Sequence, residues 1–179
     1  MGNDIVDLQL ARKQSNWRRR GWLQKIYTNA EQKYILASKT PEILVWKFWS
    51  MKEATYKAHQ RRFMLSPTFN PKDFECLPDD HVLVDNHIYN LQTEITTNYV
   101  YSVAKTSGTK CCSNIYDGEI DIKDNLKRLI AEELNISTSI AIQKDVNRIP
   151  MAYINKKEGN IQFSITHHGR YSAIVLVTK

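Results

Sequence analysis

The chain has 179 residues, a formal net charge of +6, 42% hydrophobic residues and 25% charged residues. This length predicts one domain or two small lobes with a real hydrophobic core, and the low counts of glycine (6) and proline (5) exclude disordered and collagen-like classes. No stretch approaches about 18 apolar residues and the first residues lack a signal-peptide pattern, so we expect a soluble, cytoplasmic protein.

The positive charge is concentrated in the first third of the chain. Residues 1–62 hold 13 Lys and Arg against 5 Asp and Glu, whereas residues 63–179 hold 12 against 14. Such a localised field indicates a polyanionic partner, which could be a nucleic acid, a phosphorylated metabolite or an acidic protein. The alternative is a basic face that is simply solvated.

The first part of the chain predicts a strand followed by helices. Asn3–Leu8 is expected to form a short strand that runs into a helix carrying Arg18–Arg20. Thr28 and Glu31 have the spacing of a capping box, and they predict an amphipathic helix that continues through Ala37.

A longer helix is predicted next. Thr40 as the N-cap and Pro41 at the first helical position open a helix that extends to about Gln60. Strands are then expected at residues 82–84, 88–95 and 99–105, followed by a helix on which Leu126, Leu129, Ile130 and Leu134 recur, and by strands at residues 140–143, 151–154, 161–165 and 171–177.

A small polar stretch at residues 106–110 separates the first run of strands from the second helical region. We place a lobe boundary there, with one lobe at residues 1–106 and a shorter one at residues 107–179. The fold class predicted from this order of elements is α+β.

The long helix carries an unusual combination of side chains. Trp46, Trp49, Glu53 and Lys57 fall within about 80° of arc, so an acid and an amine share a stripe with two indoles. One interpretation is a solvated Glu–Lys pair at i and i+4, which is common and stabilises a helix weakly. The tryptophans favour the other interpretation, a carboxylate beside apolar surface that requires a cation or a metal.

Asp4 is also a carboxylate beside apolar residues, because it lies in a strand that is predicted to be part of the core. Together, Asp4 and Glu53 could supply the two protein ligands that Mg²⁺ takes while leaving positions for phosphate oxygens. The alternative is that Asp4 caps a helix.

The third candidate is the segment Ser164–Arg170, which lies between two apolar strands. Its hydroxyls, imidazoles and guanidinium could receive a phosphate. The sequence contains no G-x-S-x-G, Walker A or G-x-G-x-x-G motif. Cys76, Cys111 and Cys112 have no metal-ligand spacing, and we assign them no role.

These segments together resemble the 4′-phosphopantetheinyl transferase superfamily. Gly2–Val6 matches the G-x-D-I-V/E signature, Trp49–Ala58 matches W-x-x-K-E-A/S-x-x-K-A, and Ser164–His167 matches S-L/I-S/T-H. The resemblance implies transfer of 4′-phosphopantetheine from coenzyme A to a serine of an acidic apo carrier protein, with Mg²⁺ and with release of adenosine 3′,5′-bisphosphate.

The resemblance also implies a role for individual residues. Asp4 and Glu53 would be Mg²⁺ ligands, Glu53 and Lys57 would be catalytic, and Lys52 would contact coenzyme A. Thr166 and His167 would lie at the 3′-phosphate of coenzyme A. Arg148, in a stretch similar to G-K/R-x-P, would be a further contact to that phosphate.

The family resemblance has two departures. Val6 stands where larger members have a second acid, as in the small holo-acyl-carrier-protein synthases. Residues 1–106 resemble the metal-bearing half of a pseudodimeric enzyme. Residues 117–179 resemble the latter part of its other half, which comes first in those enzymes, so the order of the two halves is exchanged here. One chain could then supply both sides of a cleft, so an active monomer is expected. The competing hypotheses are a basic nucleic-acid-binding module and a catalytically silent relative.

Overall fold

Three antiparallel sheets and one long helix organise the computed structural model, which describes residues 1–178. The elements are β1 (Gly2–Asp7), α1 (Leu8–Gln14), α2 (Trp22–Ile26), α3 (Asn29–Ala37), α4 (Pro41–Phe63), η1 (Pro71–Asp73), β2 (Glu75–Leu77), β3 (His81–Val84), β4 (His87–Ile95), β5 (Tyr99–Lys105), β6 (Cys111–Asp117), α5 (Ile122–Leu134), β7 (Ile140–Lys144), β8 (Pro150–Ile154), β9 (Lys157–Glu158), β10 (Phe163–His168) and β11 (Tyr171–Val177). Over the described part of the chain, no helix combines the length and apolar character needed to cross a bilayer.

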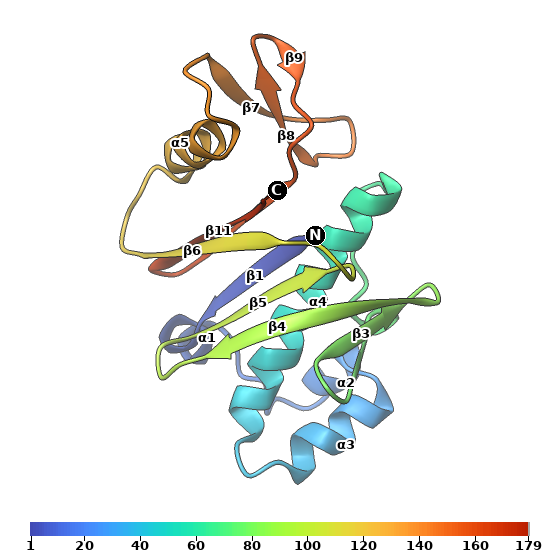
Figure 1. Cartoon of the computed structure of the whole chain (residues 1–179). Helices are drawn as coiled ribbons and strands as arrows, with labels where there is room; N and C mark the ends of the chain where they lie inside the picture. The colour runs from blue at the N-terminus through green and yellow to red at the C-terminus, as the bar shows by residue number, and fades with distance from the viewer. Residues whose placement is uncertain (179) are drawn as a thin grey trace.

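The largest sheet has the strand order β1-β5-β4-β3-β2, and α4 packs across β1 and β5. The second sheet, β10-β11-β6, contacts β1 through β10 and β11. The third, β7-β8-β9, lies with α5 at the end of the molecule opposite α2 and α3 (Figure 1). This arrangement confirms the α+β class and puts β1, the edge strand of the five-stranded sheet, against the β10-β11-β6 sheet.

The helix starts follow local sequence rules. The Thr28 side chain accepts a hydrogen bond from the backbone N–H of Glu31, and the Glu31 carboxylate accepts one from the backbone N–H of Thr28, so the capping box that opens α3 is confirmed. Helix α4 begins at Pro41 as predicted and runs three residues past Gln60, to Phe63.

The predicted helix through Arg18–Arg20 is wrong, because α1 ends at Gln14 and these arginines lie in a turn. Gly21 follows in the left-handed region at φ 81°, a conformation that interrupts a helix. The arginines are exposed, and the Arg18 guanidinium lies 4.2 Å from the centre of the Trp17 ring.

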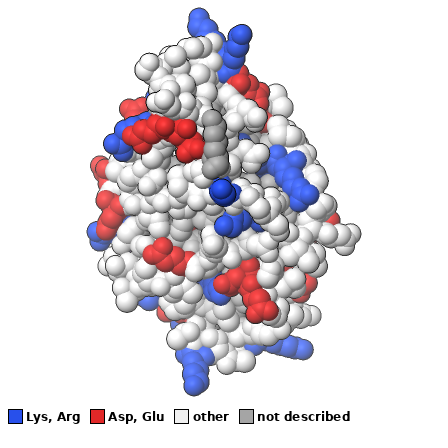
Figure 2. Space-filling model, in the orientation of Figure 1, with Lys and Arg blue, Asp and Glu red and all other residues white. Residues whose placement is uncertain are grey.

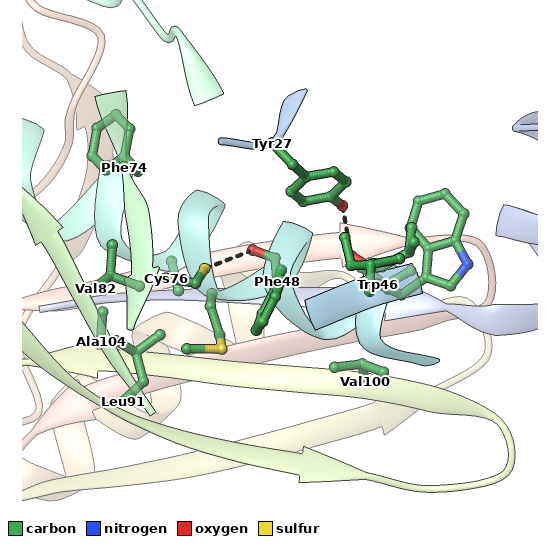
Figure 3. Close-up of a cluster of buried hydrophobic side chains, with 14 of the residues drawn as sticks. Tyr27, Trp46, Phe48, Phe74, Cys76, Val82, Leu91, Val100 and Ala104 are labelled. Carbon is green, nitrogen blue, oxygen red and sulfur yellow. Dashed lines mark hydrogen bonds between the residues drawn. The ribbon is translucent and has the colours of Figure 1, made fainter. Parts of the chain in front are cut away.

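The main core lies between α4 and the five-stranded sheet (Figure 3). Aromatic side chains from residues 22–48 contribute to it, and the indole nitrogen of Trp46 is buried there without a hydrogen-bond partner among residues 1–178. The Tyr27 hydroxyl donates to the Val45 carbonyl at 2.6 Å, and the Cys76 thiol donates to the Phe48 carbonyl at 3.6 Å. This core fixes the face that α4 turns towards β1.

A second core joins the two larger sheets. Side chains of β5 and β11 meet there, and the Tyr99 and Tyr171 rings lie 5.1 Å apart. Residues 99–105 and 171–177 therefore face one another across this core. Residues 106–110 lead from β5 into β6, which pairs with β11, while the division into two lobes at residue 106 stays a prediction.

Charge on the face drawn in Figure 2 is mixed. Lys and Arg side chains stand at both ends of the molecule, and Asp and Glu side chains interrupt them over the middle. This view therefore shows separate basic groups and not one continuous basic face.

Gly2 is the point at which β1 and α4 approach most closely, and we expect Gly2→Ala to be strongly destabilising. A Cβ at residue 2 would overlap the Ala54 carbonyl oxygen and lie 2.6 Å from the Ala58 nitrogen, both backbone atoms that cannot move alone. Overpacking of this kind typically costs about 1–3 kcal/mol or more. Urea denaturation would measure the loss of stability.

Candidate active site

Asp4 lies at the centre of the candidate site, on β1 between the two larger sheets. Its Oδ1 accepts hydrogen bonds from the Thr166 hydroxyl on β10 at 3.1 Å and from the Lys57 ammonium on α4 at 3.3 Å. Its Oδ2 is buried and has no hydrogen-bond partner among residues 1–178. Asp4 therefore does not cap a helix, and one of its oxygens is open to a ligand.

Glu53 lies on α4 and lines the same pocket as Asp4. Burial, together with the negative charge of Asp4, raises the pKa of the Glu53 carboxyl to about 7, and Lys57 opposes the shift. The two carboxyl groups share one site, and the Glu53 carboxyl is difficult to ionise there without a further cation.

Lys57 connects α4 to β1. Its ammonium donates to the Asn3 carbonyl at 2.9 Å as well as to Asp4, and its side chain is 28% exposed. The ammonium is therefore held at the carboxylates while part of the side chain remains accessible to a substrate.

Side chains of β10 fix the position of β1. The Ser164 hydroxyl accepts from the Asn3 backbone at 3.2 Å, and His168 Nδ1 accepts from the Asp7 backbone at 2.9 Å. A neutral His168 therefore carries its proton on Nε2. Burial lowers the pKa of His168 and favours this neutral form, although Asp4 and Asp7 oppose the shift.

A pocket of about 430 Å³ opens beside these groups. Its polar lining includes both candidate metal ligands and the exposed His167. The apolar lining comes mostly from β1, α1, α2 and the first half of α4, and it includes Val6, Ala11, Trp22, Ile26, Trp46 and Trp49. The structure therefore brings together Asp4, Glu53, Lys57, Thr166 and His167, which the sequence had placed in three distant segments.

Two residues that the sequence did not single out also belong to this pocket. Trp22 comes from the short helix α2, and His168 follows the predicted Ser-Ile-Thr-His segment. The His-His pair was the available signal for His168, whereas no pattern in the sequence indicated that Trp22 would fold back onto α4.

Arg148 lies elsewhere. It is exposed in the turn between β7 and β8 and lines a separate pocket of about 310 Å³ together with Lys57 and Lys144. The structure therefore does not bring Arg148 and His167 together at one phosphate.

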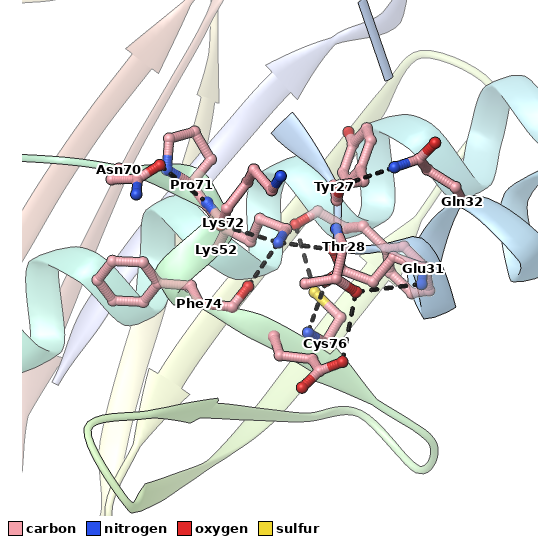
Figure 4. Close-up of polar contacts among 12 residues, drawn as sticks. Tyr27, Thr28, Glu31, Gln32, Lys52, Asn70, Pro71, Lys72, Phe74 and Cys76 are labelled. Atoms are coloured by element: carbon pink, nitrogen blue, oxygen red, sulfur yellow. Dashed lines mark hydrogen bonds and ion pairs between the residues drawn. The ribbon is translucent and has the colours of Figure 1, made fainter. Parts of the chain in front are cut away.

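Lys52 requires a correction, because its side chain is fully buried and does not line the pocket. Its ammonium donates to Glu31 Oε2 at 2.8 Å, to the Pro71 carbonyl at 2.9 Å and to the Phe74 carbonyl at 2.5 Å (Figure 4). A lysine ammonium has three donors, and all three are used. Lys52 therefore joins α4 to α3, to η1 and to the residue that follows η1, and it is not placed to contact coenzyme A.

The donor set fits a magnesium ion. Mg²⁺ is commonly held by one or two carboxylates while phosphate oxygens and waters complete its shell. Asp4 offers an unpartnered buried oxygen, and Glu53 has a pKa raised by burial and by a neighbouring negative charge, which a cation would reverse. No cluster of three or more His, Cys, Asp or Glu suited to a metal occurs within residues 1–178, so the protein would supply two ligands.

The raised pKa of Glu53 predicts how the stability of the metal-free protein depends on pH. The protonated form is favoured in the folded state, so the stabilisation is complete below the unfolded pKa of 4.5 and is lost as pH rises through about 7. The loss should be about 3 kcal/mol. Urea denaturation in a chelator at pH 5 and pH 8 would measure it, and Glu53→Gln should remove most of the difference.

The chain belongs to the 4′-phosphopantetheinyl transferase superfamily, whose family model matches residues 1–112. Among solved structures, the holo-[acyl-carrier-protein] synthase (AcpS) of Thermotoga maritima is similar at 12% identity, with 83% of each chain covered and a TM-score of 0.39. No curated protein sequence matches the chain. The family resemblance read from the three sequence motifs is thus confirmed.

Proposed function

We propose that this protein transfers 4′-phosphopantetheine from coenzyme A to a serine of an apo carrier protein in a Mg²⁺-dependent reaction. The observation that carries the proposal is the contact of Asp4 with Lys57 and Thr166 beside the pocket that Asp4 and Glu53 line, in a chain of this family. A Mg²⁺ ion held by the two carboxylates would neutralise charge on the pyrophosphate of coenzyme A.

The protein side chains would bind and orient the reacting groups. Lys57 offers a cation to the pyrophosphate, and the exposed His167 offers a further polar contact at the mouth of the pocket. Catalysis then depends mainly on positioning and on stabilisation of charge.

In the transfer step, the serine hydroxyl oxygen bonds to the phosphorus nearer pantetheine. The bond from that phosphorus to the bridging oxygen breaks, and adenosine 3′,5′-bisphosphate leaves with the electron pair. The serine proton passes to a carboxylate of the site, and Glu53 is the acceptor in this proposal.

The carrier protein would approach over the basic segment between α1 and α2. Arg18–Arg20 are exposed there, and Gln14 and Ser15 just before them line the pocket. An acidic carrier would be attracted to this segment, and the attraction should weaken as salt is added.

The test is incubation of the protein with coenzyme A, an apo carrier protein and Mg²⁺, with mass detection of the carrier. A mass increase equal to one phosphopantetheine, abolished by a chelator, is expected. Binding of coenzyme A without transfer to several apo carriers would instead indicate a catalytically silent relative. Binding of nucleic acid without binding of coenzyme A would favour the basic binding module.

We also expect the protein to be active as a monomer. Asp4 and Lys57 on one side of the site and Thr166 on the other come from the same chain and are already in contact. Light scattering together with activity measured over a dilution series would test this. A stable trimer whose activity disappears on dilution would contradict it.

A further inference from the structure

Strands β1 and β10 lie side by side but belong to different sheets. Within residues 1–178, no backbone–backbone hydrogen bond joins the two strands. The polar contacts between them involve side chains, from Ser164 at one end to His168 at the other. The spacing of the two strands therefore depends on a small number of side chains.

The Asp7 carboxylate, at the end of β1, holds two segments at once. Its Oδ1 accepts from the backbone N–H groups of Gln9 and Leu10, at 2.9 and 3.1 Å, and so caps α1. Its Oδ2 accepts from the backbone N–H of Arg170 at 3.2 Å, in the turn between β10 and β11. Burial raises the pKa of Asp7, but the hydrogen bonds from Leu10, Arg170 and Gln9 outweigh it and lower the pKa below its ordinary value. A charged carboxylate therefore joins the start of α1 to this turn.

The turn is shaped for this contact. Gly169 lies in the left-handed region at φ 60°, and a Cβ at this residue would overlap the Asp7 carboxylate. On the other side of the turn, the Arg170 guanidinium makes two hydrogen bonds to Asp117 on β6, at 2.5 and 2.7 Å. The turn is thus fixed to its own sheet on one side and to Asp7 on the other.

Both elements that Asp7 joins contribute to the wall of the pocket of about 430 Å³. Helix α1 lines this pocket through Ala11 and Gln14, and β10 lines it through His167 and His168. Asp7 itself is 4% exposed and does not line the pocket. Its carboxylate can therefore set the spacing of the two walls without contacting a ligand between them.

We propose that Asp7 is a positioning residue for the candidate active site, and that its carboxylate sets the place of His167 relative to α1. The inference rests on the proposed function, in which His167 contacts the substrate, and adds to it a residue that acts without touching the substrate. The candidate metal ligands lie on β1 and α4, which this contact does not join. Loss of the contact should therefore weaken binding of coenzyme A and leave the transfer step nearly unchanged.

Asp7→Ser separates the two roles of the carboxylate. A serine hydroxyl can still cap α1, but it is too short to reach the Arg170 N–H. The KM for coenzyme A should rise by about fivefold or more, because a hydrogen bond to a charged group is lost. The kcat and the dependence on Mg²⁺ should change less than about twofold.

Asp121→Ser is the matched control for this variant. Asp121 caps α5 in the same way, with hydrogen bonds from Lys123 and Asp124 at 2.9 and 3.0 Å, and it does not line the pocket. Its replacement removes a capping carboxylate and keeps a capping hydroxyl, so it should change neither KM nor kcat.

Hydrogen exchange at the Arg170 amide tests the contact without any substrate. In Asp7→Ser this amide should exchange about tenfold faster or more, while the Leu10 amide, which the serine hydroxyl can still cap, should keep its protection. Gly169→Ala approaches the same contact from the turn, because its methyl group would displace the carboxylate. It should also raise KM, and by less in the Asp7→Ser background.

Three results would overturn the inference: unchanged exchange at Arg170 in Asp7→Ser, faster exchange with an unchanged KM for coenzyme A, or a fall in kcat in place of a rise in KM. Equal effects of Gly169→Ala in both backgrounds would also contradict it. If the unmodified protein transfers nothing from coenzyme A, the proposed function itself fails, and the inference about catalysis fails with it. Exchange at Arg170 would then still show whether Asp7 holds the turn.

Discussion

Asp4→Asn and Glu53→Gln should each lower turnover by a factor on the order of 10²–10³ while the protein remains folded. Each change removes one negative charge from the candidate metal site with almost no change in volume, so the affinity for Mg²⁺ falls and the pyrophosphate loses its neutralising partner. Rates measured over a range of Mg²⁺ concentrations, together with melting temperatures, would separate this effect from misfolding.

Glu42→Gln provides the matched control for these variants. Glu42 also lies on α4 and makes a hydrogen-bonded ion pair, with Arg12 at 2.8 Å, but it lines neither of the pockets that flank Asp4. Its replacement should leave turnover nearly unchanged. Near-normal rates for both Asp4→Asn and Glu53→Gln at saturating Mg²⁺ would show that the two carboxylates do not hold the metal.

Lys52→Met should destabilise the protein by about 3–5 kcal/mol, because it leaves the Glu31 carboxylate buried without its partner. Glu31 also accepts from the backbone of Cys76 at 2.7 Å and closes the capping box of α3, so the stranded charge lies where α3, α4 and β2 meet. Urea denaturation would measure the loss of stability.

The double variant Lys52→Met/Glu31→Gln should recover much of that stability, since it removes both charges and keeps similar volumes. The affinity of the folded protein for coenzyme A should be close to that of the unmodified protein in both variants. Unchanged stability with a large loss of coenzyme A affinity would instead show that Lys52 contacts coenzyme A.

The elements predicted well are those set by local rules. The capping box at Thr28 and the Pro41 start of α4 depend on residues within one turn of helix, and both are visible in the sequence. Strand β6 was not predicted because residues 111–117 are mostly polar or small and lack a clear alternation. It forms because β11 offers a partner from another part of the chain.

In the candidate site too, features set by local spacing were predicted and contacts between distant segments were not. Helical spacing correctly put Glu53 on the stripe with Trp46 and Trp49, but it could not show that Lys52, one residue earlier, would be covered by η1 and the residue that follows it. The contacts of Asp4 depend on which strand lies beside β1, and no local pattern carries that information. The family motifs named these residues, and the fold determined which of them meet.

The hydrogen bond between Thr166 and Asp4 joins residues 162 positions apart. Closing a chain segment of that length has an entropic cost of about 4–5 kcal/mol that local contacts do not offset, and contacts of such high sequence separation tend to form late. During synthesis, α4 and the five-stranded sheet can pack before β10 has emerged, so the first lobe would exist for some time with Asp4 uncovered. Assembly of the site would then be the final step of folding on the ribosome, and a chain that stops before residue 163 would keep its main core but have no site.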